Sequence, residues 1–404
     1  MEKLTGKYGL PLRVQFCKKC TMNNQRPSSV VEFKQKVGEK KRTLSFGEDG
    51  ICEACRYAEQ KKSINWDERH KELEELCNKF RRTDGRYDVV VPGSGGKDSV
   101  QAAHILKYKY NMNPILITWP PALYTDIGRR NFDAWLDAGF ANYTYNQNKK
   151  LHRFLTKNAF LNLGHPFQPF ILGQKNLAPR LSVLLDIPLV IFGENEAEYG
   201  NAIEENEKPT RDSKYYSAEL SIQDLVLGGI PAKDLLDDFD FKLSDLEAYF
   251  PVSPHEVEKT GTEVHYLGYY IKWHPQDVYY YSVENSNFMP NDYRTEGSFS
   301  KYSSLDDKID WLHYHTTNIK FGIGRATYDS AQEIRNGDIT REDGIALIKR
   351  FDGEFPEQYI QDCCKYMDIT IQQYHDAIEK FRSPHLWHKV NDNWELKNPI
   401  WKKS

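Results

Sequence analysis

The chain has 404 residues, with 54 lysines and arginines against 58 aspartates and glutamates, so its formal net charge is −4. This balance argues against broad, nonspecific nucleic-acid binding, which depends on many cations meeting phosphates. Aromatic residues make up 13% of the chain, which excludes a disordered polypeptide. No apolar run reaches the roughly 18 residues of a membrane span, and the N-terminus lacks the apolar core of a secretion signal. We therefore expect a cytoplasmic protein that does not enter a membrane.

Two CxxC pairs stand near the N-terminus, Cys17 with Cys20 and Cys52 with Cys55. Four thiolates in tetrahedral geometry are typical of a closed, structural zinc site. Residues 21–51, which separate the pairs, form a longer spacer than the commonest four-cysteine pattern has, and a zinc ribbon with an inserted hairpin accommodates it. An iron–sulfur cluster and a redox pair of cysteines are the alternatives. We expect a zinc-binding module over residues 1–63.

The next part of the chain predicts an α/β domain over residues 64–250. A helix over 65–82 leads into four short apolar segments that read as strands, at 88–92, 114–118, 141–145 and 189–193, with helices over 99–110, 127–138, 148–160 and 175–186 between them. Strands that alternate with helices indicate a parallel sheet. Ligands of such sheets bind beyond the carboxyl ends of the strands, so we expect the site there.

The last part, residues 251–404, reads as mainly helical. Helices are expected over 306–317, 327–335, 340–351, 355–366 and 370–381, and the aromatic segment 264–281 is long enough to hold a strand.

The sharpest motif is Ser-Gly-Gly-Lys-Asp-Ser at 94–99, directly after the first expected strand. Paired glycines let the backbone turn tightly and present N–H groups to an anion, and the following helix adds its positive end. Lys97 supplies a cation, and Asp98 suits polyphosphate chemistry if it holds Mg²⁺. The segment is not the GxxxxGK[ST] P-loop, because Val91 and Asp98 occupy the glycine and hydroxyl positions. A glycine-rich turn without a ligand is the alternative.

A second polar segment follows the fourth strand: Gly-Glu-Asn-Glu-Ala-Glu-Tyr-Gly-Asn at 193–201. Glu194 or Glu198 can bind Mg²⁺ or act as a base there. Asn195 and Tyr199 are further candidates for contact with a substrate. A charged surface loop is the alternative interpretation.

Two more segments carry candidate groups. At 168–176, Gln174 and Lys175 offer an amide and a cation for a polar, anionic ligand, although the segment also reads as the start of a helix. At 320–325, Lys320 and Arg325 flank a glycine-containing turn and can close over pyrophosphate, unless this is an ordinary loop.

The strand, SGGKDS loop and helix resemble the signature of the PP-loop ATP pyrophosphatases. Taken with the CxxC…GICEAC module, the GENEAEYGN loop and the KFGIGRATYDSAQEIRNGDITREDG stretch, the chain resembles the N-acetyl sugar amidotransferase family, whose members serve lipopolysaccharide and flagellin amidino-sugar biosynthesis. The resemblance implies conversion of a sugar acetamido group to an acetamidino group. It also implies an O-adenylated intermediate, with release of AMP and pyrophosphate. ATP, Mg²⁺ and a structural Zn²⁺ are the implied cofactors, and a nucleotide-linked acetamido sugar is the implied substrate.

The resemblance also distributes roles among the residues. The implied catalytic residues are Lys97, Asp98, Glu194, Lys320 and Arg325. The implied ATP-binding residues are Pro92, Gly93, Ser94, Gly95, Gly96, Lys97, Asp98, Ser99, Thr118, Trp119 and Gly193, with the backbone of Thr118 and Trp119 reading adenine. The implied substrate-binding residues are Gln174, Lys175, Asn195, Glu198 and Tyr199. Zinc falls to the four cysteines and Mg²⁺ to Asp98.

The chain shows no glutaminase of its own: residue 2 is Glu2, and no cysteine stands in a nucleophile elbow. Ammonia is therefore expected from outside, and the family resemblance suggests a glutaminase–cyclase-like pair as its source. Two other functions remain open. A tRNA thiolase of the same superfamily also joins SGGKDS to CxxC knuckles, and a nucleotide-binding zinc-ribbon adaptor would lack turnover.

Overall fold

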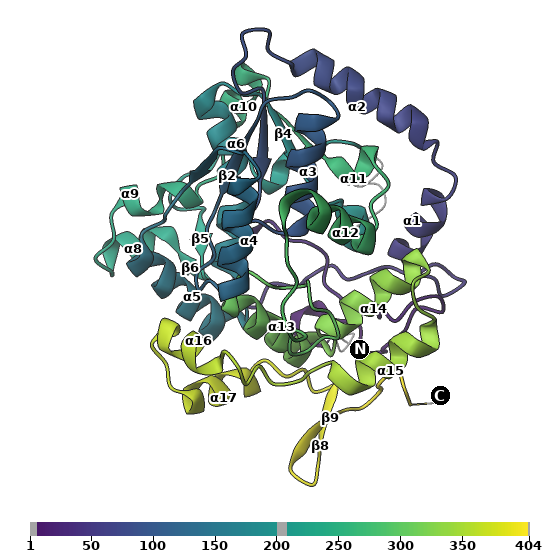
Figure 1. The fold of residues 1–404 in the computed structure, drawn as a ribbon. Coiled ribbons are helices and arrows are strands. Elements are labelled where there is room, and N and C mark those ends of the chain that lie inside the picture. The colour runs from purple at the N-terminus through teal and green to yellow at the C-terminus, as the bar shows by residue number, and fades with distance from the viewer. Residues whose placement is uncertain (1–5, 200–207, 403–404) are drawn as a thin grey trace.

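The computed structural model describes residues 6–199 and 208–402 (Figure 1). Its centre is a five-stranded sheet in the order β3-β2-β1-β4-β7 with every neighbouring pair parallel. The strands are β1 Val89–Pro92, β2 Pro114–Thr118, β3 Asn142–Thr144, β4 Leu189–Phe192 and β7 Glu263–Tyr266. The predicted parallel α/β fold is confirmed. The sheet also takes in β7, which lies beyond residue 250, where the sequence analysis ends the α/β domain.

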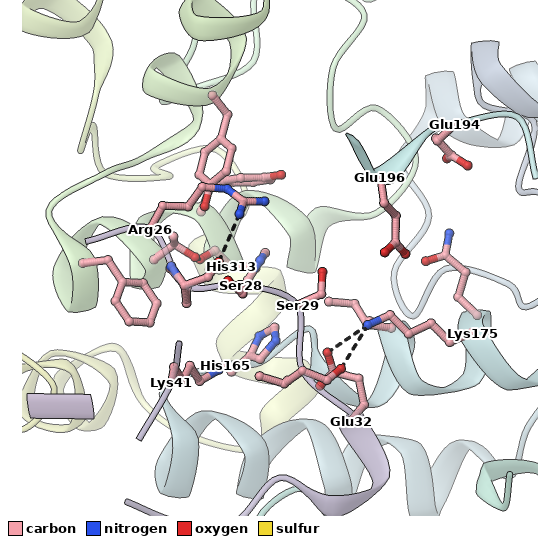
Figure 2. Close-up of a pocket in the computed structure, with 18 of the residues that line it drawn as sticks. Arg26, Ser28, Ser29, Glu32, Lys41, His165, Lys175, Glu194, Glu196 and His313 are labelled. Carbon is pink, nitrogen blue, oxygen red and sulfur yellow. Dashed lines mark hydrogen bonds and ion pairs between the residues drawn. The ribbon is translucent and has the colours of Figure 1, made fainter. Parts of the chain in front are cut away.

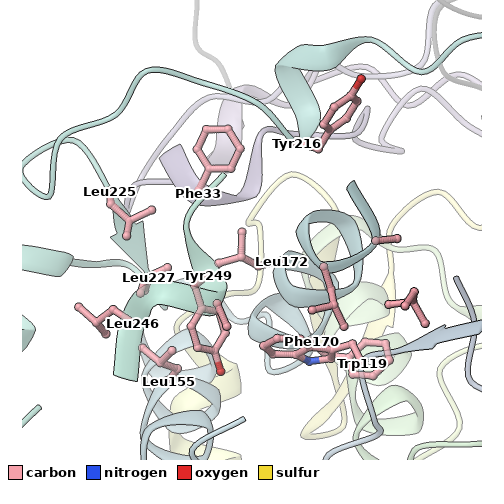
Figure 3. Packing of buried hydrophobic residues seen from close by; sticks show 14 of the residues in the cluster. Phe33, Trp119, Leu155, Phe170, Leu172, Tyr216, Leu225, Leu227, Leu246 and Tyr249 are labelled. Carbon is pink, nitrogen blue, oxygen red and sulfur yellow. The ribbon is translucent and has the colours of Figure 1, made fainter. Parts of the chain in front are cut away.

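Successive strand residues face opposite sides of the sheet, so alternate side chains enter two different cores. Val89 and Val91 pack with helices on one side, whereas Val90 packs with helices on the other. The first side is covered by α2 (Trp66–Phe80), α3 (Lys97–Tyr108), α4 (Asp126–Asp137) and α11 (Leu267–Tyr270). The second is covered by α5 (Lys149–Leu163) and α6 (Gln168–Leu185). The domain therefore has three layers, and Figure 3 shows the second core, where Trp119 and Tyr249 pack beside Phe170.

Helix α6 begins earlier than the expected residue 175. Pro169 stands at the first turn, where a missing N–H costs nothing, and the buried residues Phe170 and Leu172 continue the apolar face. The segment 168–176 is thus helix and not loop.

Between β4 and β7 the chain forms short elements. They are β5 Val226–Leu227, β6 Ile230–Pro231, α8 Ala232–Asp237, α9 Leu243–Leu246 and α10 Pro254–Thr260, with 3₁₀ turns at Glu196–Tyr199, Ser213–Tyr215 and Glu247–Tyr249. The C-terminal region has α12 Pro275–Ser286, α13 Lys308–Phe321, α14 Arg325–Asn336, α15 Arg341–Phe351, α16 Ile360–Met367, α17 Ile371–Glu379 and a hairpin of β8 Trp387–Val390 and β9 Asn393–Leu396. This confirms the mainly helical C-terminal region.

The N-terminal module has little regular structure besides α1 (Glu53–Lys61) and two 3₁₀ turns, Lys7–Gly9 and Glu32–Lys34. Isolated bridges such as Phe16 with Asn23 and Phe46 with Cys52 hold its knuckles. Its buried residues share one core with the C-terminal region, including Phe321, Ile323 and Leu386. In Figure 1 the module accordingly lies against α14 and α15, far along the chain.

Candidate functional site

The SGGKDS loop at residues 94–99, here called the phosphate loop, follows β1, where the order of the strands along the sheet changes direction. Strand β1 pairs with β2 on one side and with β4 on the other, so the loops after β1 and β4 leave the same edge of the sheet and open a crevice. Gly95 has φ +91°, and a side chain there would collide with the backbone of Phe132. A side chain on Gly193 would collide with the carbonyl of Asp98, so this glycine lets the two loops meet.

Helix α3 begins at Lys97, and its N-cap residue Gly96 provides no side-chain acceptor. The N–H groups of the first turn are therefore available to an anion, with the positive end of the helix behind them. The Thr118 hydroxyl donates to the Gly93 carbonyl at 2.7 Å and fixes the start of the loop. The Ser99 hydroxyl donates to the Gly96 carbonyl at 2.9 Å and fixes its end. The loop is thus preorganised.

Three charged residues stand at the mouth of the crevice. Lys97 Nζ lies 2.6 Å from Asp98 Oδ2, and the Trp273 indole N–H donates to Asp98 Oδ1 at 2.7 Å. Glu194 follows β4 directly, and burial, followed by the negative charge of Asp98, raises its pKa to about 7. A carboxylate with a pKa near neutrality is suited to exchanging protons with a substrate.

These residues line a cavity of about 340 Å³, here called the loop cavity. Its charged lining residues in the described chain are two cations, Lys97 and Arg325, and six carboxylates, Asp98, Glu194, Asp306, Asp310, Asp329 and Glu333. Burial raises the pKa of Asp310 to about 6 and that of Glu333 to about 7, and the Ser94 hydroxyl donates to Asp306. Carboxylates therefore outnumber cations in the lining of the loop cavity, and the backbone N–H groups at the start of α3 are its further positive feature.

A second cavity of about 380 Å³ adjoins it, here called the basic cavity. Figure 2 shows Arg26, Lys41, Lys175 and His313 around it, with Glu194 at the end of β4. Both cavities are lined by Gln174, Glu194, Tyr314, Arg325, Asp329 and Gln332. The two spaces therefore meet along a shared wall.

The four predicted metal ligands come together. All four Sγ atoms lie within 4.8 Å of one another, with Cys17 to Cys55 at 3.8 Å and Cys20 to Cys52 at 3.7 Å. A tetrahedron with metal–sulfur bonds of about 2.3 Å has sulfur–sulfur edges of about 3.8 Å. The donor set therefore fits a single ion. Cysteines that each hold a different iron of a cluster stand further apart.

Asn195 and Glu198, expected to bind substrate, contact α1 of the N-terminal module. Glu198 is 2% exposed and forms an ion pair with Lys61 of α1. The Asn195 amide donates to the Tyr57 hydroxyl at 2.9 Å. Neither residue lines the loop cavity or the basic cavity. The structure thus places both side chains against α1, a contact between distant segments that the sequence does not reveal. The side chain of Tyr199, and residues Gly200 and Asn201, lie outside what the structure describes.

The expected adenine contact at Thr118 and Trp119 is also not open. Trp119 is 3% exposed, stacks on Tyr145 at 5.7 Å and packs against Gly173. Only about 10 Å³ of space lies between Gly93 and Trp119. The indole ring of Trp119 packs in the core against α6, and the described residues leave no space for an adenine ring beside it.

The remaining candidates divide between the two cavities. Lys97, Asp98, Glu194 and Arg325 share the loop cavity, as expected of a common site. Lys320 does not reach it: its ammonium donates to the Leu163 carbonyl at 2.6 Å and lines the basic cavity. Gln174 borders both cavities, whereas Lys175 borders the basic one and lies 3.3 Å from Glu32.

Several lining residues escaped sequence reasoning. Trp273, Asp306 and Lys41 come from segments without a motif and reach the cavities through the fold. His165 and His313 also line the basic cavity.

Comparisons with known proteins bear on the C-terminal part. Residues 296–400 match a family described as "LPS biosynthesis protein WbpG-like, C-terminal domain". A curated protein from Methanocaldococcus jannaschii, described as "Uncharacterized protein MJ1599", is 32% identical over 77 residues. That match covers 19% of this chain and 27% of the relative, so the chain matches about a quarter of that protein.

Among solved structures, the U34-tRNA thiolase NcsA from Methanococcus maripaludis, solved with its [4Fe-4S] cluster, is 12% identical. The alignment covers 88% of this chain and 97% of that one with a TM-score of 0.28, a likeness too low to support an argument.

The class of protein follows from the fold and the loop: a PP-loop α/β protein with an N-terminal four-cysteine cluster. Residues 296–400 are similar to the family described as "LPS biosynthesis protein WbpG-like, C-terminal domain", which covers about a quarter of the chain. The resemblance inferred from the sequence is confirmed at this level. No helix in the described part of the chain is long and apolar enough to cross a membrane.

Proposed function

We propose that this protein is an ATP-dependent amidotransferase that converts the acetamido group of a nucleotide-linked sugar to an acetamidino group. The observation that carries the proposal is the junction of two cavities. One holds a phosphate loop and the other is lined by cations, and the WbpG-like region contributes residues to both. Adenylation at such a junction suits an unreactive amide, because it turns the amide oxygen into part of a good leaving group.

The lining of the loop cavity fits Mg²⁺. Two cations face six carboxylates there, so a bare triphosphate would be repelled unless a divalent cation accompanied it. Asp98, with Asp306, would hold the ion. When bound, Mg²⁺ offsets phosphate charge and leaves the pyrophosphate a better leaving group.

The chain's own residues then have distinct tasks. The loop backbone and Lys97 bind the β- and γ-phosphates, and Arg325 offsets charge from the opposite wall. The amide oxygen attacks the α-phosphorus, and the bond to pyrophosphate breaks. Ammonia adds to the imidate carbon, Glu194 accepts a proton from the new nitrogen, and the carbon–oxygen bond breaks to release AMP. Oxygen is thereby exchanged for NH in the sugar.

The four cysteines are best suited to a structural Zn²⁺. Their sulfur spacing fits one tetrahedral ion, all four are buried, and backbone N–H groups of Lys19 and Met22 donate to the sulfurs at 3.4 Å. Closed, buried thiolates of this kind stabilise a fold and do not turn over substrate. No cysteine lines the loop cavity or the basic cavity in the described residues, which weighs against sulfur-transfer chemistry at the ATP site.

Ammonia is proposed to come from a glutaminase–cyclase-like partner pair in the cytoplasm. Neither nucleic acid nor a membrane enters the proposed reaction.

The test is release of AMP and pyrophosphate. Purified protein receives ATP, Mg²⁺, an ammonium salt and a panel of nucleotide-linked acetamido sugars, and sugar mass is followed in parallel. Sugar-dependent AMP with a product in which NH replaces O is the expected result. AMP formation that requires tRNA, with every sugar unchanged, would refute the proposal and favour the thiolase.

A further inference from the structure

Three lysines converge on the basic cavity from separate parts of the chain. Lys41 comes from the N-terminal module, Lys175 from α6 and Lys320 from α13. Burial is the largest cause that lowers the pKa of both Lys41 and Lys320; Glu32 opposes it at both and Glu39 at Lys41, while the charge of Lys175 adds to the lowering at Lys41 and that of Lys41 adds to it at Lys320. Like charges held this close without equal counter-charge are costly, and an anionic ligand would relieve the repulsion.

The protein itself supplies only part of the counter-charge. The charged lining of the basic cavity in the described chain is six cations, Arg26, Lys41, Lys175, Arg211, Lys320 and Arg325, and four carboxylates, Glu32, Glu194, Glu196 and Asp329. Three of these carboxylates are already paired: Glu32 with Lys175, Glu196 with Arg211, and Asp329 with Arg325. The remaining one, Glu194, belongs to the wall shared with the loop cavity. The excess of positive charge therefore falls at the lysine end.

Two histidines complete that end. The rings of His165 and His313 stack with centroids 4.6 Å apart, and both line the cavity. Burial lowers the pKa of His313 to about 3, and burial and the neighbouring cations lower that of His165, so both rings are neutral at pH 7. Neither Nδ1 atom has a hydrogen-bond partner within the described chain. Each neutral imidazole can donate one N–H hydrogen bond to an anion, and it carries no negative charge that would repel the anion.

The two cavities thus make opposite electrostatic demands. The loop cavity is acidic and needs a divalent cation to hold phosphates, whereas the basic cavity has cations of its own. At about 380 Å³ it has the size of a small-molecule site.

We propose that the lysine end of the basic cavity, formed by Lys41, Lys175, Lys320 and the stacked His165 and His313, binds the diphosphate of the nucleotide-linked sugar without a metal ion. The proposal rests on the proposed function for the identity of the ligand. It makes the N-terminal module part of the substrate site, since Arg26, Ser28, Ser29 and Lys41 belong to that module.

The probe is inorganic pyrophosphate in Mg²⁺-free buffer, with binding measured by titration calorimetry on the full chain. Loss of one charged hydrogen bond to a phosphate weakens binding about tenfold or more. We expect that weakening for both Lys41→Met and Lys320→Met. The matched control is Lys349→Met, which removes an exposed lysine of α15 outside both cavities and should change the Kd by less than about twofold. Thermal unfolding of each variant shows whether it is folded.

Pyrophosphate can also bind the phosphate loop, and Lys97→Met separates the two sites. If Lys97→Met weakens Mg²⁺-free binding more than Lys41→Met does, the anion sits on the loop and the inference is overturned. Absence of any binding to the wild-type protein overturns it as well.

Steady-state kinetics distinguish this failure from failure of the proposed function. Where a sugar supports AMP release, Lys41→Met should raise the KM for that sugar and leave the KM for ATP unchanged. Sugar-dependent AMP release with an unchanged sugar KM would leave the amidotransferase standing and refute the diphosphate site. Pyrophosphate binding that depends on Lys41 and Lys320, without any sugar-dependent AMP release, would support the anion site at the lysine end and refute the amidotransferase.

Discussion

The buried ion pair between Lys61 and Glu198 ties the N-terminal module to the loop after β4, and it gives the sharpest test of the structure. The side chains are 6% and 2% exposed. Lys61 also donates to the Trp273 carbonyl at 2.8 Å, and the Trp273 indole donates to Asp98. A change at Lys61 or Glu198 should therefore affect both stability and the phosphate site.

The magnitude follows from the charge that each substitution leaves behind. Removing one partner of a buried pair costs about 3–5 kcal/mol, because the other charge stays buried and unpaired. Neutralising the survivor limits that cost. At pH 7 deprotonating a lysine of pKa about 10.4 costs about 4.6 kcal/mol, and protonating a glutamate of pKa about 4.3 costs about 3.7 kcal/mol. We expect Glu198→Gln to lower the free energy of unfolding by about 3–4.6 kcal/mol and Lys61→Met by about 3–3.7 kcal/mol.

The double variant, Lys61→Met with Glu198→Gln, leaves no buried charge and should lose less than either single variant. A double-mutant cycle measured by urea unfolding then gives a coupling energy of about 3 kcal/mol. The matched control is Lys62→Met, at the residue just after the end of α1, whose exposed pair with Glu59 should contribute no more than about 1 kcal/mol.

The pH dependence of the single variants provides a second check, because it differs in sign. The surviving Lys61 is easier to neutralise as pH rises, so the cost of Glu198→Gln should shrink toward high pH. The surviving Glu198 is easier to neutralise as pH falls, so the cost of Lys61→Met should shrink toward low pH. Additive single effects, or costs that do not move with pH, would refute the reasoning.

Three further predictions concern the site. Asp98→Asn should abolish AMP formation with an unchanged thermal midpoint, since Asp98 is only partly buried and pairs with the adjacent Lys97; retained turnover would contradict its role. The pKa of Glu194 is raised to about 7, so its protonation stabilises the fold fully below about pH 4.3 and this stabilisation is lost as pH rises through 7. Glu194→Gln should therefore reduce the fall of the thermal unfolding midpoint over this pH range, and it should remove the increase in the rate of AMP release as pH rises through 7. An unchanged pH–rate profile would exclude Glu194 as the base. Chelation of the metal, or Cys17→Ser, should lower the midpoint and the soluble yield together, and elemental analysis of the purified protein should give one zinc per chain; a stoichiometry of four irons would contradict the single-ion geometry.

Local motifs explain how much of this site the sequence could predict. The SGGKDS loop depends on neighbouring residues, Gly95 at positive φ and Gly96 at the helix start, so its shape was visible in the chain itself. The two CxxC pairs likewise form knuckles before they meet. The alternation of apolar strands with helices placed four of the five sheet strands, and the fifth, β7, was only allowed for within a longer aromatic segment.

Several candidate residues lie elsewhere than the sequence indicates, and the physical cause is contact between distant segments. The partners of Glu198 and Asn195 come from α1, which supplies Lys61 and Tyr57 from well over a hundred residues away and so leaves no signal in the local sequence. Trp119 was expected beside adenine, but the glycine at 173 lets α6 pack on its ring. Lys320 was expected at the pyrophosphate, but α13 directs it to the Leu163 carbonyl.

On the proposed function, the reaction takes place at the wall that the two cavities share. Adenylation requires the α-phosphorus and the acetamido oxygen to meet, yet the phosphates of ATP and of the sugar carrier must stay apart because they repel one another. The two cavities satisfy both needs, since the phosphate loop and the lysine end lie in different spaces that meet at Gln174, Glu194 and Arg325. Arg325 can then offset charge as it develops at phosphorus, and Glu194 stands where ammonia must lose a proton. On the proposed function, the N-terminal module is part of the active site, because it provides Arg26 and Lys41 to the basic cavity.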